Sequence, residues 1–565
     1  MVFDPQAIYD RLQAVQHHIA QYPTIEIPEG AFEDVYRILS RNFAARDHRS
    51  IVEEDKADCD PLGHVFDAYI CHIQGNFHGV SVETAEALCD RTITQYILTQ
   101  INLKVRTIDG SQSDRFSTIQ DLFLNLDSTL CYVLLYEILP NLTILDPACG
   151  SGTLLIAATK TLINLYLQVI QQAESLVSQA KSKVPYKREL KAWLATIKTT
   201  SQHLTYALKR QIISDNLYAV DLHNEAIEIT KLRLYLGLLT SAQTAADLAD
   251  FPDLDFSIMS GNSLIGVMRV DAEGFDAVGE MKQGNLLQPL AADHYRAVLT
   301  DKHLSIEQYK HQAAVLAELE GISSSSKRAF LKEHIAKINR TAQAKLNQLL
   351  LTEFSQKLGI KYSQFQASGK PVKRLLTIAD IEALHPFHWG YHFADILENR
   401  GGFDIIITHS PNKLLKPQMQ EFLTQHQALT ATKHLEIQRA SPKQIMLQDA
   451  ELTNHWLTYQ SQFPHVAAYY QSAQQYTNGS ISKKRINLYE LLIKQCCNLL
   501  RAGGECGLLI TGMSLNDLDH NSLQERLPDR TTLTAFTEHN HPTPQKSKKR
   551  SQCISFIVHI HPYEG

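Results

Sequence analysis

Hydrophobic positions recur at helical spacing through much of the first 140 residues. Apolar side chains return every three or four positions in 32–44, 84–101 and 119–139, a spacing that places them on one face of a helix. We therefore predict a helical N-terminal domain over residues 1–140.

From residue 142 the pattern changes to short apolar runs that alternate with longer amphipathic segments. The predicted strands are 143–145, 217–220 and 256–259, and the predicted helices between them are 152–170 and 224–239. This β-α-β-α-β order is typical of an α/β fold with a doubly wound parallel sheet. We assign residues 141–270 to the first half of that sheet domain.

The next segment, residues 271–380, is polar and rich in Gln, Lys, Glu and Ala, which predicts a helical insertion. The sheet then resumes in residues 381–565 with an apolar strand at 403–407. Further along we predict a helix at 487–500 that is closed by a turn at Gly503 and Gly504. A strand at 506–510 and a terminal hairpin of 532–537 and 553–560 follow.

Composition favours an ordinary globular protein. Of 565 residues, 44% are hydrophobic and 20% charged. No uninterrupted apolar run has the length of a membrane span, and the N-terminus lacks a basic region followed by an apolar one. We therefore expect a cytoplasmic protein without a membrane partner. The nine cysteines show no Cys-x-x-Cys pair, which predicts reduced thiols and no metal site.

The net charge of −6 restricts any contact with nucleic acid to local basic patches. Two short runs qualify, Lys483–Arg485 and Lys546–Arg550. Each is either a phosphate contact or a solvated loop, because short basic runs occur in both settings.

A glycine-rich turn between the first strand and its helix predicts a cofactor loop. Gly150 and Gly152 lack side chains, so the backbone can approach a ligand closely, and the N–H groups at the start of the helix suit a carboxylate or phosphate. The loop residues that we expect to bind the cofactor are Asp146, Pro147, Ala148, Cys149, Gly150 and Gly152.

Polar residues also follow the next two strands. Asp221 ends the second strand, where an acidic side chain usually accepts hydrogen bonds from ribose hydroxyls, and Leu222 lies beside it. Asn262 follows the third strand and offers an amide that could pair with an adenine edge. The three signals in this order predict a nucleotide-like cofactor.

The loop Asp146–Leu155 resembles the S-adenosylmethionine loop of N6-adenine-specific DNA methyltransferases, and especially of the type IIG restriction-modification and BREX-like group. The resemblance covers roughly residues 60–560. It is carried further by Val220–Leu234, Gly261–Gly266, Phe387–Trp389, Gly401–Asp404, Asn487–Tyr489 and Leu500–Gly504.

This resemblance implies a Rossmann-like methyltransferase sheet, S-adenosylmethionine as cofactor and DNA as partner. Asp146 and the Gly150–Gly152 loop would hold the methionine end of the cofactor, Asp221 the ribose and Asn262 the adenine.

The catalytic motif of that family is altered here. Its members carry Asn or Asp, two prolines and an aromatic residue, which accept the two N–H bonds of the target amine and stack on the flipped base. The corresponding residues are His409, Ser410, Pro411 and Asn412. A neutral imidazole offers one acceptor nitrogen, and Asn412 cannot stack, a contact worth about 1–3 kcal/mol per base.

Other departures from the family pattern lie near the two ends of the region that resembles it. The segment 79–84 lacks the aromatics that relatives carry before the loop, and no target-recognition domain follows the terminal hairpin, so we expect a separate specificity subunit. Glu54–Lys56 matches a nuclease element of relatives only as a chance triplet, and His385 and His388 fit packing better than metal binding.

Two hypotheses follow. The first is a methyltransferase domain of the adenine-N6 class whose catalysis is impaired or lost at residues 409–412. The second is a non-catalytic subunit that binds S-adenosylmethionine or serves as a scaffold in a DNA-modification or defence complex.

Overall fold

The computed structural model describes most of the chain from residue 80 onward. The described residues are 80–110, 114–178, 185–200, 204–241, 252–278, 294–316, 323–366, 369–411, 413–419, 422, 450–472, 486–511, 531–541 and 551–560. The predicted helix at 32–44, the Glu54–Lys56 triplet, Asn412 and both basic runs lie outside them.

A seven-stranded sheet with the order β3-β2-β1-β6-β7-β9-β8 forms the centre of the molecule. Neighbouring strands from β3 to β7 are parallel, and β9 and β8 add an antiparallel hairpin. The Rossmann-like fold with a terminal hairpin is therefore confirmed. The strand bounds are β1 Ile144–Asp146, β2 Leu217–Asp221, β3 Ile258–Ser260, β6 Phe403–Pro411, β7 Leu500–Thr511, β8 Thr531–His541 and β9 Ser551–Ile560.

Strands β6 and β7, which run toward the candidate site, are longer than predicted. Strand β6 continues four residues beyond Ile407, because it pairs with the long strand β7 as far as Pro411. The predicted turn at Gly503 and Gly504 lies inside β7. Phe403 pairs with Leu500 but Ile405 pairs with Glu505, so the glycines form an irregularity in the ladder rather than a break before it.

The helices of the first half cover the sheet and carry the connections between its strands. They are α4 Val82–Asp109, α5 Ile119–Leu124, α6 Ser128–Tyr132, the π-helix Val133–Ile138, the 3-10 turn Leu139–Asn141, α7 Thr153–Ser178, α8 Lys187–Thr200, α9 Leu204–Asp215 and α10 Asn224–Leu239. The predicted single helix at 119–139 is wrong in one respect. It is interrupted at Asn125–Asp127, where the Asp127 side chain accepts a hydrogen bond from Leu130 N (2.8 Å) and starts a new helix.

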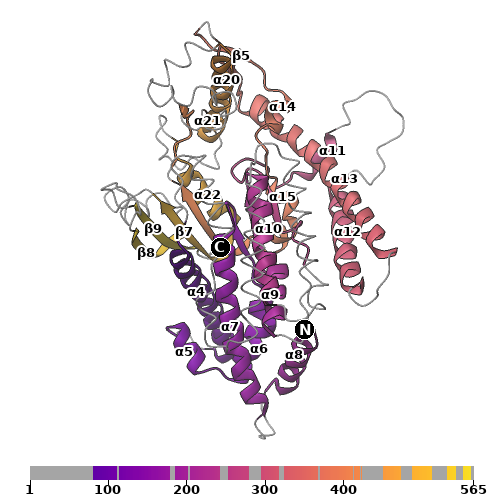
Figure 1. Ribbon diagram of the computed structural model, residues 1–565, viewed down its shortest axis with the longest axis vertical. Helices are drawn as coiled ribbons and strands as arrows, with labels where there is room; N and C mark the ends of the chain where they lie inside the picture. The colour runs from indigo at the N-terminus through magenta and orange to yellow at the C-terminus, as the bar shows by residue number, and fades with distance from the viewer. Residues whose placement is uncertain are drawn as a thin grey trace, which may run out of the picture.

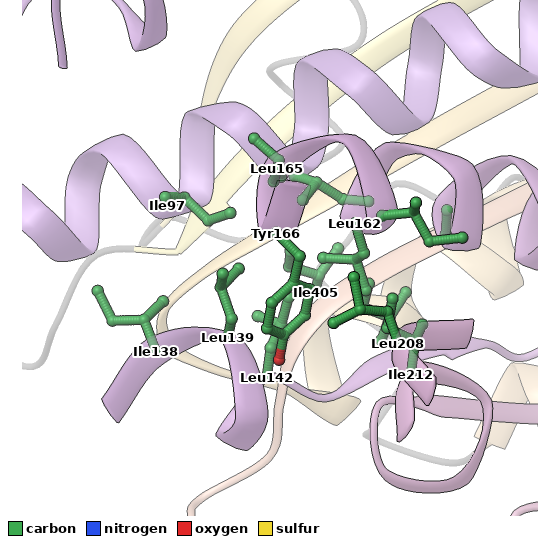
Figure 2. Close-up of a cluster of buried hydrophobic side chains, with 14 of the residues drawn as sticks. Ile97, Ile138, Leu139, Leu142, Leu162, Leu165, Tyr166, Leu208, Ile212 and Ile405 are labelled. Atoms are coloured by element: carbon green, nitrogen blue, oxygen red, sulfur yellow. The ribbon is translucent and has the colours of Figure 1, made fainter. Parts of the chain in front are cut away.

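The described part of the N-terminal segment shares a hydrophobic core with the sheet. Figure 2 shows Ile97 of α4 and Ile138 near Tyr166 of α7 and Ile405 of β6. Helix α4 also lies against β7, where a Cβ atom at Gly507 would stand 2.3 Å from Thr92 Oγ1. The described residues between 80 and 140 therefore form a layer of the Rossmann-like fold, packed directly on its strands.

Helix α7 is long and apolar enough to cross a membrane by length and composition. However, 67% of its most apolar stretch is buried inside the protein, as expected of a core helix. Its burial explains the composition without a membrane.

The region between β3 and β6 is mostly helical, as predicted, but it also contains a small β-hairpin that the sequence did not reveal. Its elements are α11 Ala272–Ala277, α12 Tyr295–Leu316, α13 Ser323–Thr352, the π-helix Glu353–Lys357, β4 Tyr362–Gln364, β5 Val372–Arg374, α14 Ile378–Glu382, α15 Trp389–His392 and the π-helix Asp395–Asn399. After β6 come α20 Ala450–Ser461, α21 Phe463–Ser472 and α22 Leu488–Leu499. In Figure 1 the helices α12 and α13 project to one side of the sheet layers, while β5, α14, α20 and α21 gather at one end.

A buried carboxylate fixes the end of the sheet at which β6 begins. Asp404 is 1% exposed and accepts hydrogen bonds from Tyr96 Oη (2.7 Å) and from both Thr143 N (2.8 Å) and Thr143 Oγ1 (2.9 Å). Arg400 and Arg501 form ion pairs with it. Because a buried charge is tolerated only when it is paired, Asp404 ties α4, β1 and β7 to one point.

Candidate functional site

The candidate site lies where the strand order reverses. Strand β1 has β2 on one side and β6 on the other, and all three are parallel. In open α/β sheets ligands bind beyond the carboxyl ends of the strands at such a switch point. The predicted cofactor loop leaves the carboxyl end of β1, and residues 409–411 form the carboxyl end of β6.

The cofactor loop depends on its two glycines. Gly150 and Gly152 have φ angles of +53° and +82°, a region that side chains disfavour. At Gly152 space is lacking as well, because a Cβ atom would lie 2.7 Å from Thr230 Cγ2 of α10. Helix α7 can start against α10 only with glycine at this position.

Two side chains of α10 hold the loop from behind. Thr230 Oγ1 donates to the Gly150 carbonyl oxygen (2.9 Å). Arg233, 6% exposed, donates from Nη1 to the Ser151 carbonyl oxygen, to Ser151 Oγ (2.7 Å) and to Thr153 Oγ1 (3.2 Å). Sequence reasoning missed both residues, because a threonine or an arginine within a helix looks like an ordinary solvent-facing polar position.

Asp146 connects the two halves of the site. It is 1% exposed, and its Oδ1 accepts hydrogen bonds from Ala148 N (3.1 Å) and from Thr408 Oγ1 of β6 (2.8 Å). Burial raises the pKa of Asp146 to about 7, although these hydrogen bonds oppose the shift. The loop and β6 are therefore joined by direct contact just before His409.

Asp221 supports the loop from β2. Its Oδ2 accepts a hydrogen bond from Gly150 N (2.9 Å) and its Oδ1 from His223 N (2.9 Å). Burial raises the pKa of this carboxyl, and the two hydrogen bonds counteract that effect. Each carboxylate oxygen has a further lone pair, so the predicted contact with a ribose remains chemically available. The adjacent Leu222 is 48% exposed and offers an apolar surface beside it.

Asn262 is largely occupied by the protein itself. Its backbone N donates to the His385 carbonyl oxygen (2.6 Å), and its side chain donates to the Leu384 carbonyl oxygen (3.2 Å) and accepts from Leu264 N (3.1 Å). The amide keeps one N–H and one lone pair for a ligand. Its role toward adenine stays a prediction.

The remaining loop residues make structural contacts. The Pro147 carbonyl oxygen accepts a hydrogen bond from Ser263 Oγ, and Cys149 N donates to the Val220 carbonyl oxygen (3.2 Å). The side chain of Ala148 packs on a hydrophobic cluster beneath the site. These contacts join the loop to strand β2 and to the segment that follows β3.

The altered catalytic motif begins inside strand β6. His409 pairs with Leu509 and Ser410 with Ile510, and the two side chains are 8% and 1% exposed. Strand β1 pairs with β6 only at Ile405 and Ile406. Beyond these residues β6 extends past the end of β1, and Thr408 contacts Asp146 at the start of the cofactor loop. The chain after the motif is held by α22, since Leu488 N donates to the Lys413 carbonyl oxygen (2.9 Å).

Residues 80–84, part of the segment in which relatives carry aromatics, lead into helix α4. Ser81, the N-cap of α4, accepts a hydrogen bond from Thr84 N (3.2 Å). One turn and a half further on, Cys89 Sγ donates to the Leu154 carbonyl oxygen (3.3 Å) at the start of α7. Helix α4 therefore contacts the first turn of α7, which directly follows the cofactor loop.

His388 behaves as a packing residue. It is fully buried, its Nδ1 accepts from Val267 N (3.2 Å), and its Nε2 contacts Asn347 Oδ1 (2.9 Å). Burial lowers the pKa of His388 to about 4, which keeps the ring neutral at physiological pH. The described part of the chain contains no group of three or more His, Cys, Asp or Glu side chains that could hold a metal ion.

Comparison with known proteins assigns the same region to one class. Residues 128–251 match the family model described as the MmeI DNA-methyltransferase domain, and residues 215–412 match that of the Eco57I restriction-modification methylase. The two matches join at α10, and together they include the cofactor loop and the altered motif. This part of the chain, residues 128–412, is therefore similar to restriction-modification methyltransferases.

One curated protein has a related sequence. A protein of Methanocaldococcus jannaschii, named as a candidate type II restriction enzyme and methyltransferase, is 27% identical over 334 residues. The alignment covers 54% of this chain but only 26% of the archaeal protein. The chain thus corresponds to about a quarter of that relative.

Proposed function

We propose that this chain binds S-adenosylmethionine and is an adenine-N6 DNA methyltransferase domain whose catalysis is impaired at residues 409–412. The observation that carries the proposal is a contrast within one site. The cofactor loop keeps its glycines and is held by Thr230 and Arg233 of α10. In contrast, the positions that should activate the target amine carry His409 and Ser410.

Several features of the loop fit the cofactor. The positive φ angles of Gly150 and Gly152 leave the backbone open to a ligand, and the N–H groups at the start of α7 suit a carboxylate. Asp221 offers lone pairs for ribose hydroxyls, and Leu222 offers an apolar surface for a ring. S-adenosylmethionine, when bound, would supply an electrophilic methyl group.

The chain's own residues would have to prepare the adenine amine. In this role the Ser410 carbonyl oxygen and one nitrogen of His409 would accept the two N–H bonds, which redirects the nitrogen lone pair out of the ring. A protonated imidazole cannot accept, so this version requires neutral His409. Without a stacking aromatic the flipped base would also lose about 1–3 kcal/mol, or one to two powers of ten in rate.

A repair variant tests the proposal. Transfer of labelled methyl from S-adenosylmethionine to mixed unmethylated DNA is measured for the wild type and for His409→Asn with Ser410→Pro and Asn412→Tyr. Because Ser410 pairs with β7 and proline lacks an N–H, the variant with only His409→Asn and Asn412→Tyr is measured beside it. Calorimetry with S-adenosylmethionine is run on all three proteins.

We expect equal cofactor affinity in the three proteins and a gain in methyl transfer of at least tenfold in a repaired one. Full activity of the wild type would overturn the proposed impairment. An absence of cofactor affinity would overturn the cofactor assignment. Cofactor binding with no transfer in any of the proteins would favour the alternative, a non-catalytic subunit that senses S-adenosylmethionine or acts as a scaffold for a partner.

A further inference from the structure

The small hairpin β4–β5 and its neighbouring turns are strongly basic. Residues 354–379 contain five Lys or Arg side chains and no Asp or Glu, although the whole chain has a net charge of −6. Four of these cations are exposed and the fifth is half-buried. They are Lys357, Lys361, Lys370, Lys373 and Arg374.

A polar pocket of about 400 Å³ opens between this hairpin and α20. Its walls include Gln364 and Gln366 from the hairpin and Asn454 and Thr458 from α20, together with the ring of Tyr362. Amide and hydroxyl groups both donate and accept hydrogen bonds, so the pocket can bind a ligand with a mixed polar edge.

Arg374 presents a fixed planar cation in the same pocket. Its Nη1 and Nη2 donate to the two carboxylate oxygens of Asp380 at 2.6 and 2.7 Å, and its guanidinium lies 4.0 Å from the centre of the Tyr362 ring. The Arg374 side chain is still 39% exposed. Because Asp380 already neutralises its charge, a guanidinium held flat in this way is suited to stacking on a base, with little further loss of conformational freedom.

The pocket lies on the catalytic side of the sheet. One hydrophobic cluster joins Ile265, which follows β3, and Leu415, which follows β6, to Tyr362 and Ile381 of the hairpin region. In Figure 1 β5, α14 and α20 gather beyond α22, and α8 lies at the opposite end of the molecule. A DNA segment entering the candidate site would therefore pass near the hairpin.

We propose that the β4–β5 hairpin and its pocket are a DNA-binding site, an inference that rests on the proposed action on DNA. The lysines contact backbone phosphates, and Arg374 with the amides of the pocket receives the polar edge of one nucleotide. Phosphate contacts of this kind make binding depend on salt, whereas contacts with a nucleotide edge add affinity that salt affects little.

Charge reversal on the full chain tests the phosphate contacts. Binding of a labelled DNA duplex is measured by fluorescence anisotropy at several salt concentrations for Lys370→Glu with Lys373→Glu. The matched control is Arg188→Glu with Lys191→Glu on α8, which changes the net charge equally at the far end. We expect the hairpin variant to bind at least tenfold more weakly and its salt slope to fall by about 1 to 2, and the control to stay within about twofold.

A second variant tests the pocket. Gln364→Ala with Asn454→Ala removes two polar side chains from the pocket lining without changing the charge. The affinity for DNA should therefore fall about fivefold, while its salt dependence stays unchanged. Equal losses in the hairpin variant and the α8 control, or wild-type affinity in both hairpin and pocket variants, would overturn the DNA site while leaving the proposed function intact. No binding of DNA by the wild type at low salt would overturn the proposed action on DNA as well.

Discussion

The site is organised by a few buried polar side chains that each hold several backbone groups. Arg233 holds the cofactor loop, Asp146 joins it to β6, and Asp404 fixes the opposite end of β6. Motif chemistry identified Asp146 because its position after a strand is informative. It did not identify Arg233, because an arginine on a helix usually faces water.

Arg233→Gln is expected to weaken the affinity for S-adenosylmethionine about tenfold or more. The change removes charge-assisted hydrogen bonds to Ser151 and Thr153, worth about 1.5–3 kcal/mol, and leaves the loop free to move. Calorimetric titration measures the effect. Lys231→Gln on the same helix is the control, since Lys231 pairs with Asp255 and does not contact the loop; an equal loss there would contradict this role of Arg233.

At the scale of elements, regular sequence patterns predicted where helices and strands lie better than where they begin and end. Helix α10 spans Asn224–Leu239, as predicted, because the segment is rich in residues with high helix propensity, such as Leu, Glu and Lys. Strand β6 was predicted too short, because Thr408 to Pro411 become a strand only through pairing with β7. The β4–β5 hairpin was missed because three-residue strands carry almost no periodic signal.

The close contact of α4 with β7 predicts a loss of stability when a side chain is added at Gly507. Gly507→Ala should lower the free energy of unfolding by about 1–3 kcal/mol, because the new methyl group meets Thr92 Oγ1 in a filled space. Chemical denaturation of single and double variants measures it. Thr92→Ala should recover part of the loss, and strictly additive losses in the double variant would show that the two residues do not press on each other.

Gly237→Ala on α10 serves as the matched glycine control. A Cβ atom there meets nothing within 4 Å, so the substitution should stabilise the helix by up to about 1 kcal/mol. Opposite signs of the change in unfolding free energy at the two glycines would separate steric strain from a general effect of replacing glycine.

At the scale of the whole molecule, the insertion is docked on the sheet domain through buried polar contacts. Lys302 of α12 is 4% exposed and donates from Nζ to the Tyr391 carbonyl oxygen (2.9 Å), with the Tyr391 ring 4.0 Å away. Burial lowers the pKa of Lys302 to about 7. The docking of α12 therefore depends on a lysine that loses its proton more easily than in water.

This pKa predicts a stability that rises with pH. Between pH 7 and about 10 the unfolded chain keeps a proton on Lys302 that the folded chain has lost, so unfolding takes up a proton and the stability from this group increases by up to about 1.4 kcal/mol per pH unit. Lys302→Met should remove that rise and stabilise the protein at pH 7. Denaturation at pH 7, 8 and 9 measures it.

Lys337→Met provides the comparison for Lys302. Lys337 lies on α13 and is exposed, so its replacement should leave the pH dependence unchanged. If wild type and Lys302→Met show parallel curves over this range, the lysine keeps its proton in the folded protein and the docking does not depend on pH.

The sequence by itself determined the fold class, and it predicted the cofactor loop and the four positions at which the catalytic motif is altered. These properties depend on local chemistry: glycine where φ is positive, an acid at the end of a strand, and residue types that cannot accept or stack as the family's do. The tertiary structure decided the rest. It joined Arg233 and Thr230 to the loop, drew β6 through the altered motif, and placed a basic hairpin on the catalytic side, because these contacts link residues that lie far apart along the chain.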